Sequence, residues 1–191
     1  MYFTAVLTLL TLASLVAAQE SKVDDRGHVI GSDEHIAANK RMHDLMLNPT
    51  TITLRLGSPT LDKKVPESGA SYKRGDSIRF DLFITHSFTE PIEVVEGDLY
   101  SDMRPELFRD GDPIPYLKKV QDLADQREKK PETIRSVPSH LMAGNEYLIG
   151  TVDTKNWYGD LPPGHYQLSV RRRFVYGGKW IQSDSLTFEV L

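Results

Sequence analysis

The sequence of 191 residues contains no cysteine. This absence excludes disulfide bridges, zinc–thiolate sites, iron–sulfur clusters and cysteine nucleophiles. Basic residues are also not in excess: the chain has 23 Lys and Arg and 27 Asp and Glu. The resulting net charge of −4 argues against a nucleic-acid partner. The GxSxG, GxGxxG, HExxH, Walker and EF-hand patterns do not occur. These absences predict a non-enzymatic protein without a cofactor or metal.

The amino end carries an apolar segment without any charged residue. Residues 2–18 are rich in Leu, Ala, Val and Thr, and they are fewer than the about 20 residues that a membrane span needs. Val16 and Ala18 match the small-residue pattern of signal peptidase, so we predict a signal peptide at 1–18 and a new terminus at Gln19. An uncleaved anchor is the alternative, since no Lys or Arg precedes the segment. The expected location is secreted or periplasmic, with no membrane span after cleavage.

Residues 19–50 form a predicted polar tether that ends in a short helix. Ser32 or Asp33 caps this helix, and Pro49 stops it. Ile36, Met42 and other apolar residues form a stripe along it. We expect the stripe to dock on the following domain, and a partner-binding helix is the alternative reading.

From residue 51 to 191 the apolar residues alternate with a period of two, which is typical of half-buried strands. Strands are predicted by the runs at 51–56, 78–86, 91–97, 146–152, 165–174 and 180–190. Turn signals such as SPT, KRGDS and LPPG separate them. The pattern predicts an all-β fold, an antiparallel two-sheet sandwich.

Residues 98–140 interrupt the rhythm and are interpreted as a partly helical insert. The insert is expected to begin with a ragged hairpin around Asp110-Gly111 and to continue as a helix over 116–130. A sandwich needs only about 100 residues, so the insert is expected to be optional for folding. It either packs on a sheet edge or meets a partner.

The last hairpin is predicted to have a three-residue loop at 177–179, which pairs Tyr176 with Trp180. This register brings the even-numbered apolar residues of both arms to one face. It also sets Arg172 opposite Asp184, which we interpret as a structural ion pair, with a functional arginine as the alternative. Arg171 and Arg173 are expected on a solvated outer face.

The segment LPPGHYQL at 161–168 carries a resemblance to a known architecture. Tyr166 resembles the tyrosine corner of immunoglobulin-like sandwiches, whose hydroxyl bonds to the preceding backbone. The wider order, from YKRGDSI (72–78) through LFRDG (107–111) to LMAGNE (141–146), resembles exported bacterial immunoglobulin-like domains. In outline it is also similar to the intracellular proteinase inhibitor family of bacilli. The resemblance implies an immunoglobulin-like sandwich and, as an alternative function, proteinase inhibition.

Four aromatic residues near predicted loops are candidates for binding a partner. Trp157, Tyr158, Tyr176 and Trp180 can stack on sugars or anchor a protein, although Trp157 also fits a buried plug. We therefore predict a non-enzymatic exported module that binds a protein or glycan of the cell envelope, or serves structurally there. The alternatives are a proteinase inhibitor that presents an exposed loop, and a hydrolase with a site between the insert and the sandwich end. The ligand and the oligomeric state stay open.

Overall fold

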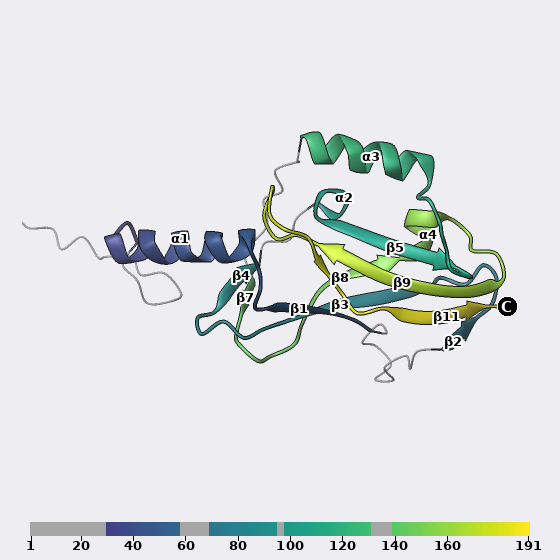
Figure 1. The fold of residues 1–191 in the computed structure, drawn as a ribbon, viewed down its shortest axis with the longest axis horizontal. Coiled ribbons are helices and arrows are strands. Elements are labelled where there is room, and N and C mark those ends of the chain that lie inside the picture. Colours follow the sequence, from purple (N-terminus) through teal and green to yellow (C-terminus); the bar gives the residue numbers. More distant parts are fainter. Residues whose placement is uncertain (1–29, 58–68, 95–97, 131–138) are drawn as a thin grey trace, which may run out of the picture. The chain divides into compact units, whose positions relative to one another are not determined.

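The structure, a computed structural model, describes residues 30–57, 69–94, 98–130 and 139–191 (Figure 1). The predicted signal peptide and the tether up to residue 29 lie outside the described residues. The chain divides between Ala37 and Ala38 into two compact units, and the second carries all the strands of the described ranges. Among the helices of those ranges, none has both the length and the apolar composition to cross a membrane.

Helix α1 (Asp33–Leu47) begins and ends where the sequence predicts. Asp33 and a second acidic residue occupy its first turn, where negative charge suits the partial positive charge of a helix N-terminus. It stops two residues before Pro49, because the residue that precedes a proline avoids helical backbone. Within the second unit, Met42 and Met46 of α1 are buried in the hydrophobic core.

The smaller sheet has three antiparallel strands in the order β1-β3-β8. They are β1 (Ile52–Gly57), β3 (Arg79–His86) and β8 (Tyr147–Asp153). The predicted alternation holds in β1, where Ile52, Leu54 and Leu56 are buried. Among the described strands, β8 has a neighbour on one side only.

The larger sheet has the order β2-β11-β9-β5-β6, and β10 pairs with β9 outside this path. Its strands are β2 (Ala70–Tyr72), β5 (Met103–Arg109), β6 (Asp112–Pro113), β9 (Gly164–Arg172), β10 (Ile181–Gln182) and β11 (Leu186–Val190). All pairs are antiparallel except β2 with β11, which is parallel. The expectation of a wholly antiparallel fold is therefore wrong at this pair, because β2 joins the larger sheet after a crossover from β1 in the smaller one.

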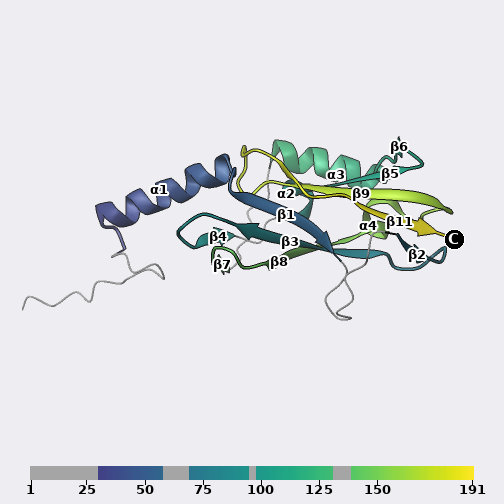
Figure 2. The ribbon, with the colours of Figure 1, turned by 60° about the horizontal axis from the view of Figure 1, so that its bottom comes forward.

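The two sheets lie over one another, and the core lies between them (Figure 2). Phe80 of β3 and Phe188 of β11 meet across the layers with ring centroids 5.3 Å apart. Leu82 and Leu168 are both fully buried. The structure therefore confirms a β-rich fold with few helices.

A separate two-stranded antiparallel sheet consists of β4 (Ile92–Val94) and β7 (Ser139–Leu141), which are far apart in the chain. His86, the last residue of β3, holds this β4–β7 sheet through a bond of 2.8 Å between Nε2 and the Leu141 carbonyl. Because His86 is buried, this bond anchors the β4–β7 sheet from inside the protein.

The interpretation of 98–140 as an optional insert is wrong for its first part. Strand β5 lies between β9 and the two-residue β6 in the larger sheet, and it pairs with β9 from Met103 opposite Arg172 to Arg109 opposite Tyr166. The predicted hairpin forms at Asp110 and Gly111, whose φ angles of 51° and 92° fit the two-residue turn that Asp-Gly favours. This segment is therefore part of the core sheet.

Three helices complete the described residues: α2 (Leu99–Asp102), α3 (Lys118–Lys129) and α4 (Thr154–Tyr158). The predicted helix over 116–130 is α3, which ends before Pro131. Its Val120 and Ala124 are buried, so its apolar stripe packs against the body of the protein.

The predicted register of the last hairpin is also wrong. Arg172 lies opposite Ile181 and not opposite Asp184, so the pairing of Tyr176 with Trp180 does not form the start of a regular ladder. The connection between β9 and β10 sets this pairing before the chain reaches Ser183. A local irregularity at Ser183 then changes the register by one residue between β10 and β11. The backbone N–H of Ser183 donates to the Val170 carbonyl at 2.8 Å, and the Ser183 hydroxyl accepts from the Val170 N–H at 2.9 Å. The hydroxyl takes the place of a backbone carbonyl in the ladder.

Candidate functional site

Two of the four candidate aromatics, Trp157 and Tyr158, lie inside the protein on α4. Trp157 is fully buried, and its ring centroid is 5.2 Å from that of Tyr116. Tyr158 is buried as well. Burying a large aromatic ring away from water stabilises the fold more than leaving the ring exposed at the surface. The prediction of an exposed binding pair is therefore wrong, and Trp157 occupies the alternative position of a buried plug.

The buried tyrosines share one hydrogen-bond acceptor, the carbonyl of Pro105 in β5. The hydroxyls of Tyr116 and Tyr158 donate to it at 2.6 and 2.8 Å. Burial raises the pKa of Tyr116 to about 12, and it raises the pKa of Tyr158 as well. These hydroxyls therefore stay protonated at neutral pH and serve as structural donors.

Trp180 and Tyr176 do not form a joint aromatic surface. The guanidinium carbons of Arg173 and Arg104 lie 4.8 and 5.3 Å from the centroid of the Trp180 ring, so arginines cover it. Tyr176 is 55% exposed, and its hydroxyl donates to the backbone carbonyl of Glu128 at 3.0 Å. Of the four predicted aromatics, Tyr176 alone is largely exposed.

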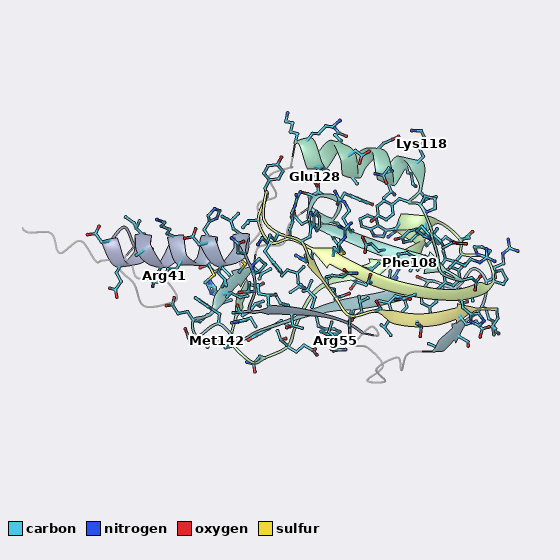
Figure 3. All side chains as sticks on the ribbon, in the orientation of Figure 1. Arg41, Arg55, Phe108, Lys118, Glu128 and Met142 are labelled. Carbon is cyan, nitrogen blue, oxygen red and sulfur yellow. The ribbon has the colours of Figure 1, made fainter. Side chains whose placement is uncertain are left out.

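Arg173 lies in the interior, so the expectation of a solvated outer face is wrong for this residue. It is 2% exposed, and its Nη1 donates to Glu128 at 2.7 Å. Glu128 lies on α3 (Figure 3). Asp102 lies 3.6 Å from its Nε. Arg104 forms an ion pair with the same Glu128, and burial lowers the pKa of Arg104. The guanidinium groups of Arg104 and Arg173 lie beneath α3, where carboxylates take the place of the water that burial removes.

Tyr166, the candidate tyrosine corner, is buried near the start of β9. Its hydroxyl donates to the carbonyl of Pro162, four residues earlier in the chain. This bond fastens the preceding loop to the strand. Tyr166 also stacks on Phe188 of β11 at 5.2 Å, so the same side chain joins the loop to the core.

The predicted ion pair between Arg172 and Asp184 does not form, because Arg172 lies opposite Ile181 and Asp184 lies beside β1. There the Asp184 carboxylate accepts a hydrogen bond of 2.7 Å from the backbone N–H of Leu56. Arg172 is 5% exposed, and its Nη1 donates to the Ile149 carbonyl of β8 at 2.6 Å. The two residues thus have separate roles, and Arg172 is the one that reaches a hollow.

That hollow is a groove of about 490 Å³ between β8 and the β4–β7 sheet. Residues 147–151 form one side of it, Val94, Ser139 and Leu141 form the other, and Arg172 also lines it. We call it the Arg172 groove. Leu148 at its rim is 51% exposed, which makes it an accessible apolar side chain in the lining. No motif in the sequence pointed to this groove, because its lining comes from segments far apart in the chain.

Two features of β8 give Arg172 its place. The pairing of β3 with β8 shifts between Leu82 and Phe83, so Ile149 is the extra residue of a β-bulge and its carbonyl is available to Arg172. At Gly150, a Cβ would stand 3.3 Å from Arg172 Nη1. The absence of a side chain there leaves room for the guanidinium beside the β8 backbone.

A second hollow of about 350 Å³ lies over the outer face of the larger sheet and is bordered by Asp110, His165 and Glu189. These are the residue types that a hydrolytic site uses. However, His165 Nδ1 lies 3.9 Å from Glu189 Oε1, which is longer than a hydrogen bond, and both side chains are exposed to water. The arrangement therefore has the composition of an acid–base site without its geometry.

The remaining charged groups act locally. The hydrogen bond from Arg55 lowers the pKa of Glu146, and Lys155 lowers the pKa of Asp160 in the same way. Within the part of the chain that the structure describes, no three His, Asp or Glu side chains gather so that they could hold a metal ion. The lining of the Arg172 groove thus combines one arginine with apolar side chains and strand backbone.

No family model and no curated protein match this chain. One solved structure to which it is similar is a mutant beta-glucosidase from Listeria innocua in complex with laminaribiose. The TM-score is 0.34 at 11% identity, over 73% of this chain and 16% of that one. The chain therefore spans only a small part of that enzyme's chain, and the likeness carries no argument about activity.

Proposed function

We propose that the chain is an exported immunoglobulin-like module that binds a protein partner of the cell envelope in the Arg172 groove. The strand order supports the immunoglobulin-like class. The orders β1-β3-β8 and β11-β9-β5 correspond to the strand orders A-B-E and G-F-C of immunoglobulin domains. The hydroxyl bond of Tyr166 near the start of β9, the equivalent of strand F, agrees with this assignment.

Export is inferred from the sequence of residues 1–18, which has the apolar character and the small residues of a cleaved leader. Sequencing the amino terminus of the protein recovered from outside the cytoplasm tests this part. We expect it to begin at Gln19, and a protein that retains residues 1–18 would favour the anchor.

The observation that carries the binding function is the buried Arg172 at the wall of an open groove. Arg172 is 5% exposed, and its Nη1 donates to the Ile149 carbonyl of β8, which fixes the guanidinium at the wall of the groove. Arginine is also the cation that recognises carboxylates in a directed, bidentate way. A binding role accounts for the groove and its charge together.

A protein is favoured over a glycan as the ligand. Sugar sites rely on exposed aromatic rings, yet Trp157 and Tyr158 are buried and Trp180 lies under arginines. The Arg172 groove offers aliphatic side chains and strand backbone instead, which suit a polypeptide.

Cross-linking from the groove tests the proposal. The purified protein, with a photoreactive cross-linker at the groove rim, is incubated with an envelope extract of the producing cell. We expect Leu148→Lys to abolish capture of a partner, because it places a charge at the apolar rim. The matched control is Leu191→Lys, which changes another exposed leucine outside the groove lining and is expected to keep capture. Equal capture by the two variants would reject the groove as the binding site.

The same protein allows the alternatives to be tested. Inhibition of secreted proteases at micromolar concentration would favour the inhibitor. A hydrolase is the other alternative, and Asp110, His165 and Glu189 of the second hollow are the residues on which it is tested. Turnover of chromogenic ester or glycoside substrates that is lost in His165→Ala would favour that hydrolase over the binding module.

A further inference from the structure

We propose that the outer face of the larger sheet holds a binding site for a neutral oligosaccharide, in which one sugar ring stacks on the ring of Phe108. The site shares no lining residue with the Arg172 groove. The inference therefore goes beyond the function proposed above and does not depend on it. It predicts two separable contributions to binding: stacking on Phe108, and hydrogen bonds from polar side chains beside that ring.

Phe108 is an aromatic residue that the core does not use. Side chains alternate along β5, and Met103 and Leu107 belong to the core, so Phe108 lies on the opposite, outer face of the sheet. It is half-buried, and it lies outside the hydrophobic core cluster. Among the described residues, no aromatic ring or guanidinium is paired with its ring. Phe108 therefore keeps an apolar surface on which a ligand can stack.

Two hollows meet at Phe108. On one side lies the second hollow of about 350 Å³, and on the other side lies a third hollow of about 240 Å³. Phe108 lines both of them. Pro113, Ile114 and Pro115 contribute an apolar lining to the third hollow. The surface thus continues on both sides of one aromatic ring, which suits a chain of linked sugar rings better than a single small molecule.

The second hollow has polar side chains that can bind hydroxyl groups. Gln167 of β9 lies directly opposite Phe108 in the ladder, so the two side chains share the outer face. The side-chain amide of Gln167 makes no hydrogen bond to any described residue. Asp110, His165 and Glu189 line the same hollow. Amides and carboxylates each present two polar atoms in one plane, so each can bind two neighbouring hydroxyls of a sugar ring.

The charges in the second hollow favour a neutral ligand over a cation. The Asp110 carboxylate lies 3.5 Å from Arg109 Nε, and that of Glu189 lies 3.9 Å from His165 Nδ1. Each carboxylate therefore already has a basic group beside it. A sugar ring has an apolar C–H face and a hydroxyl-bearing edge. This distribution matches an aromatic ring that stands beside hydrogen-bonding groups.

Isothermal titration calorimetry of the purified protein tests the inference. The probes are neutral hexasaccharides of β-linked glucose, N-acetylglucosamine, xylose and mannose. We expect at least one of them to bind, and a higher salt concentration should leave its affinity unchanged because the ligand carries no charge. If none of the hexasaccharides binds at millimolar concentration, the inference is overturned.

Substitutions at Phe108 test the stacking. Phe108→Ala should weaken binding of the hexasaccharide by about tenfold or more, whereas Phe108→Trp, which keeps an aromatic ring, should retain it. Tyr176→Ala is the matched control, because Tyr176 is an exposed aromatic residue outside both hollows, and its affinity should equal that of the wild type. Equal losses in Phe108→Ala and Tyr176→Ala would overturn the site.

Substitutions of exposed amides test the hydrogen bonds. Gln167→Ala should weaken binding by about threefold or more, because one side chain that binds hydroxyls is lost. Gln126→Ala on α3 changes an exposed glutamine outside both hollows and should leave binding unchanged. Circular dichroism checks the fold of each variant. If Phe108→Ala does not fold, Phe108→Trp and Gln167→Ala still decide the question, and full binding by Gln167→Ala rejects the hydrogen-bonding part.

A cationic probe and the fate of the sugar separate the rival readings. Binding of spermidine that is lost in Glu189→Gln, together with no binding of any hexasaccharide, would assign the second hollow to amines and overturn the inference. The bound hexasaccharide should be recovered intact, and its cleavage would show a hydrolase in place of a binding site. Cross-linking through Leu148 tests the Arg172 groove separately, so the failure of either proposal leaves the other to be judged by its own experiment.

Discussion

The substitution Leu107→Ala tests whether β5 is an integral strand or part of an optional insert. Leu107 is 2% exposed and lies opposite the fully buried Leu168 in the larger sheet. Replacing it by alanine removes three buried carbon atoms and leaves a cavity, which costs about 3 kcal/mol at such positions. An optional insert would instead accept the change with almost no loss of stability.

Urea unfolding followed by circular dichroism measures the effect. With a denaturant slope of about 2 kcal/mol per molar, typical of a domain this size, the midpoint should fall by about 1.5 M at unchanged slope. Leu123→Ala is the matched control, because Leu123 is a half-buried leucine of α3, and it should cost less than about 1 kcal/mol. A loss below about 1 kcal/mol for Leu107→Ala would refute the central position of β5.

Three further predictions concern hydrogen bonds and charges. Tyr166→Phe should lower the free energy of unfolding by about 1 kcal/mol, because the corner hydrogen bond is lost; an unchanged urea midpoint would contradict it. Glu128→Gln should lower the free energy of unfolding by about 1 kcal/mol. The value is modest because Glu128 is half exposed, although Arg173 is buried. If the ion pair is responsible, Glu128→Gln should have no effect in an Arg173→Met background. The raised pKa values of Tyr116 and Tyr158 mean that the folded state keeps protons that the unfolded state releases above about pH 10. The contribution of these two tyrosines to the free energy of unfolding should therefore be fully present below that pH and fall as the pH rises toward 12. Unfolding free energy is measured against pH, and tyrosinate absorbance follows the ionisation. A free energy of unfolding that does not change over this range would contradict the prediction.

The place of β5 in the larger sheet shows why local pattern was insufficient. Pro105 in the middle of MRPELFR argues against a central strand, since proline cannot donate to the ladder. In the structure β6 pairs only with Phe108 and Arg109, so at Pro105 the strand has β9 on one side and no strand on the other among the described residues. The proline nitrogen faces that open side, where its carbonyl meets two tyrosine hydroxyls. The tolerance for proline depends on the neighbours and cannot be read from the strand alone.

The last hairpin illustrates a partial success of sequence reasoning. The parity of the apolar residues was correct, because Leu186 lies opposite Leu168 and Phe188 opposite Tyr166. The shift along the strand was wrong, because the connection between β9 and β10 sets Arg172 opposite Ile181, and the irregularity at Ser183 changes the register by one further residue. Parity follows from burying one face, whereas the shift depends on the connection and on one side-chain bond.

The candidate site was not accessible to sequence reasoning. Arg172 was expected to meet a carboxylate across a hairpin, and it meets the Ile149 carbonyl on the other sheet instead. The aromatic candidates failed for a related reason. The sequence around Trp157 and Tyr158 does not show whether their side chains face the core or the solvent. In the structure, the short helix α4 places both of them in the interior.

The sequence by itself determined the strand-forming character of the chain, the ends of α1 and α3, and the dependence on a core without covalent bridges. These follow from alternation, proline placement and the absence of cysteine, which are properties of neighbouring residues or of composition. Only the tertiary structure decided that β5 lies inside the larger sheet, that Trp157 is buried, and that Arg172 borders a groove beside β8. Each of these depends on which distant segments come together, and that choice is made by the packing of the whole core.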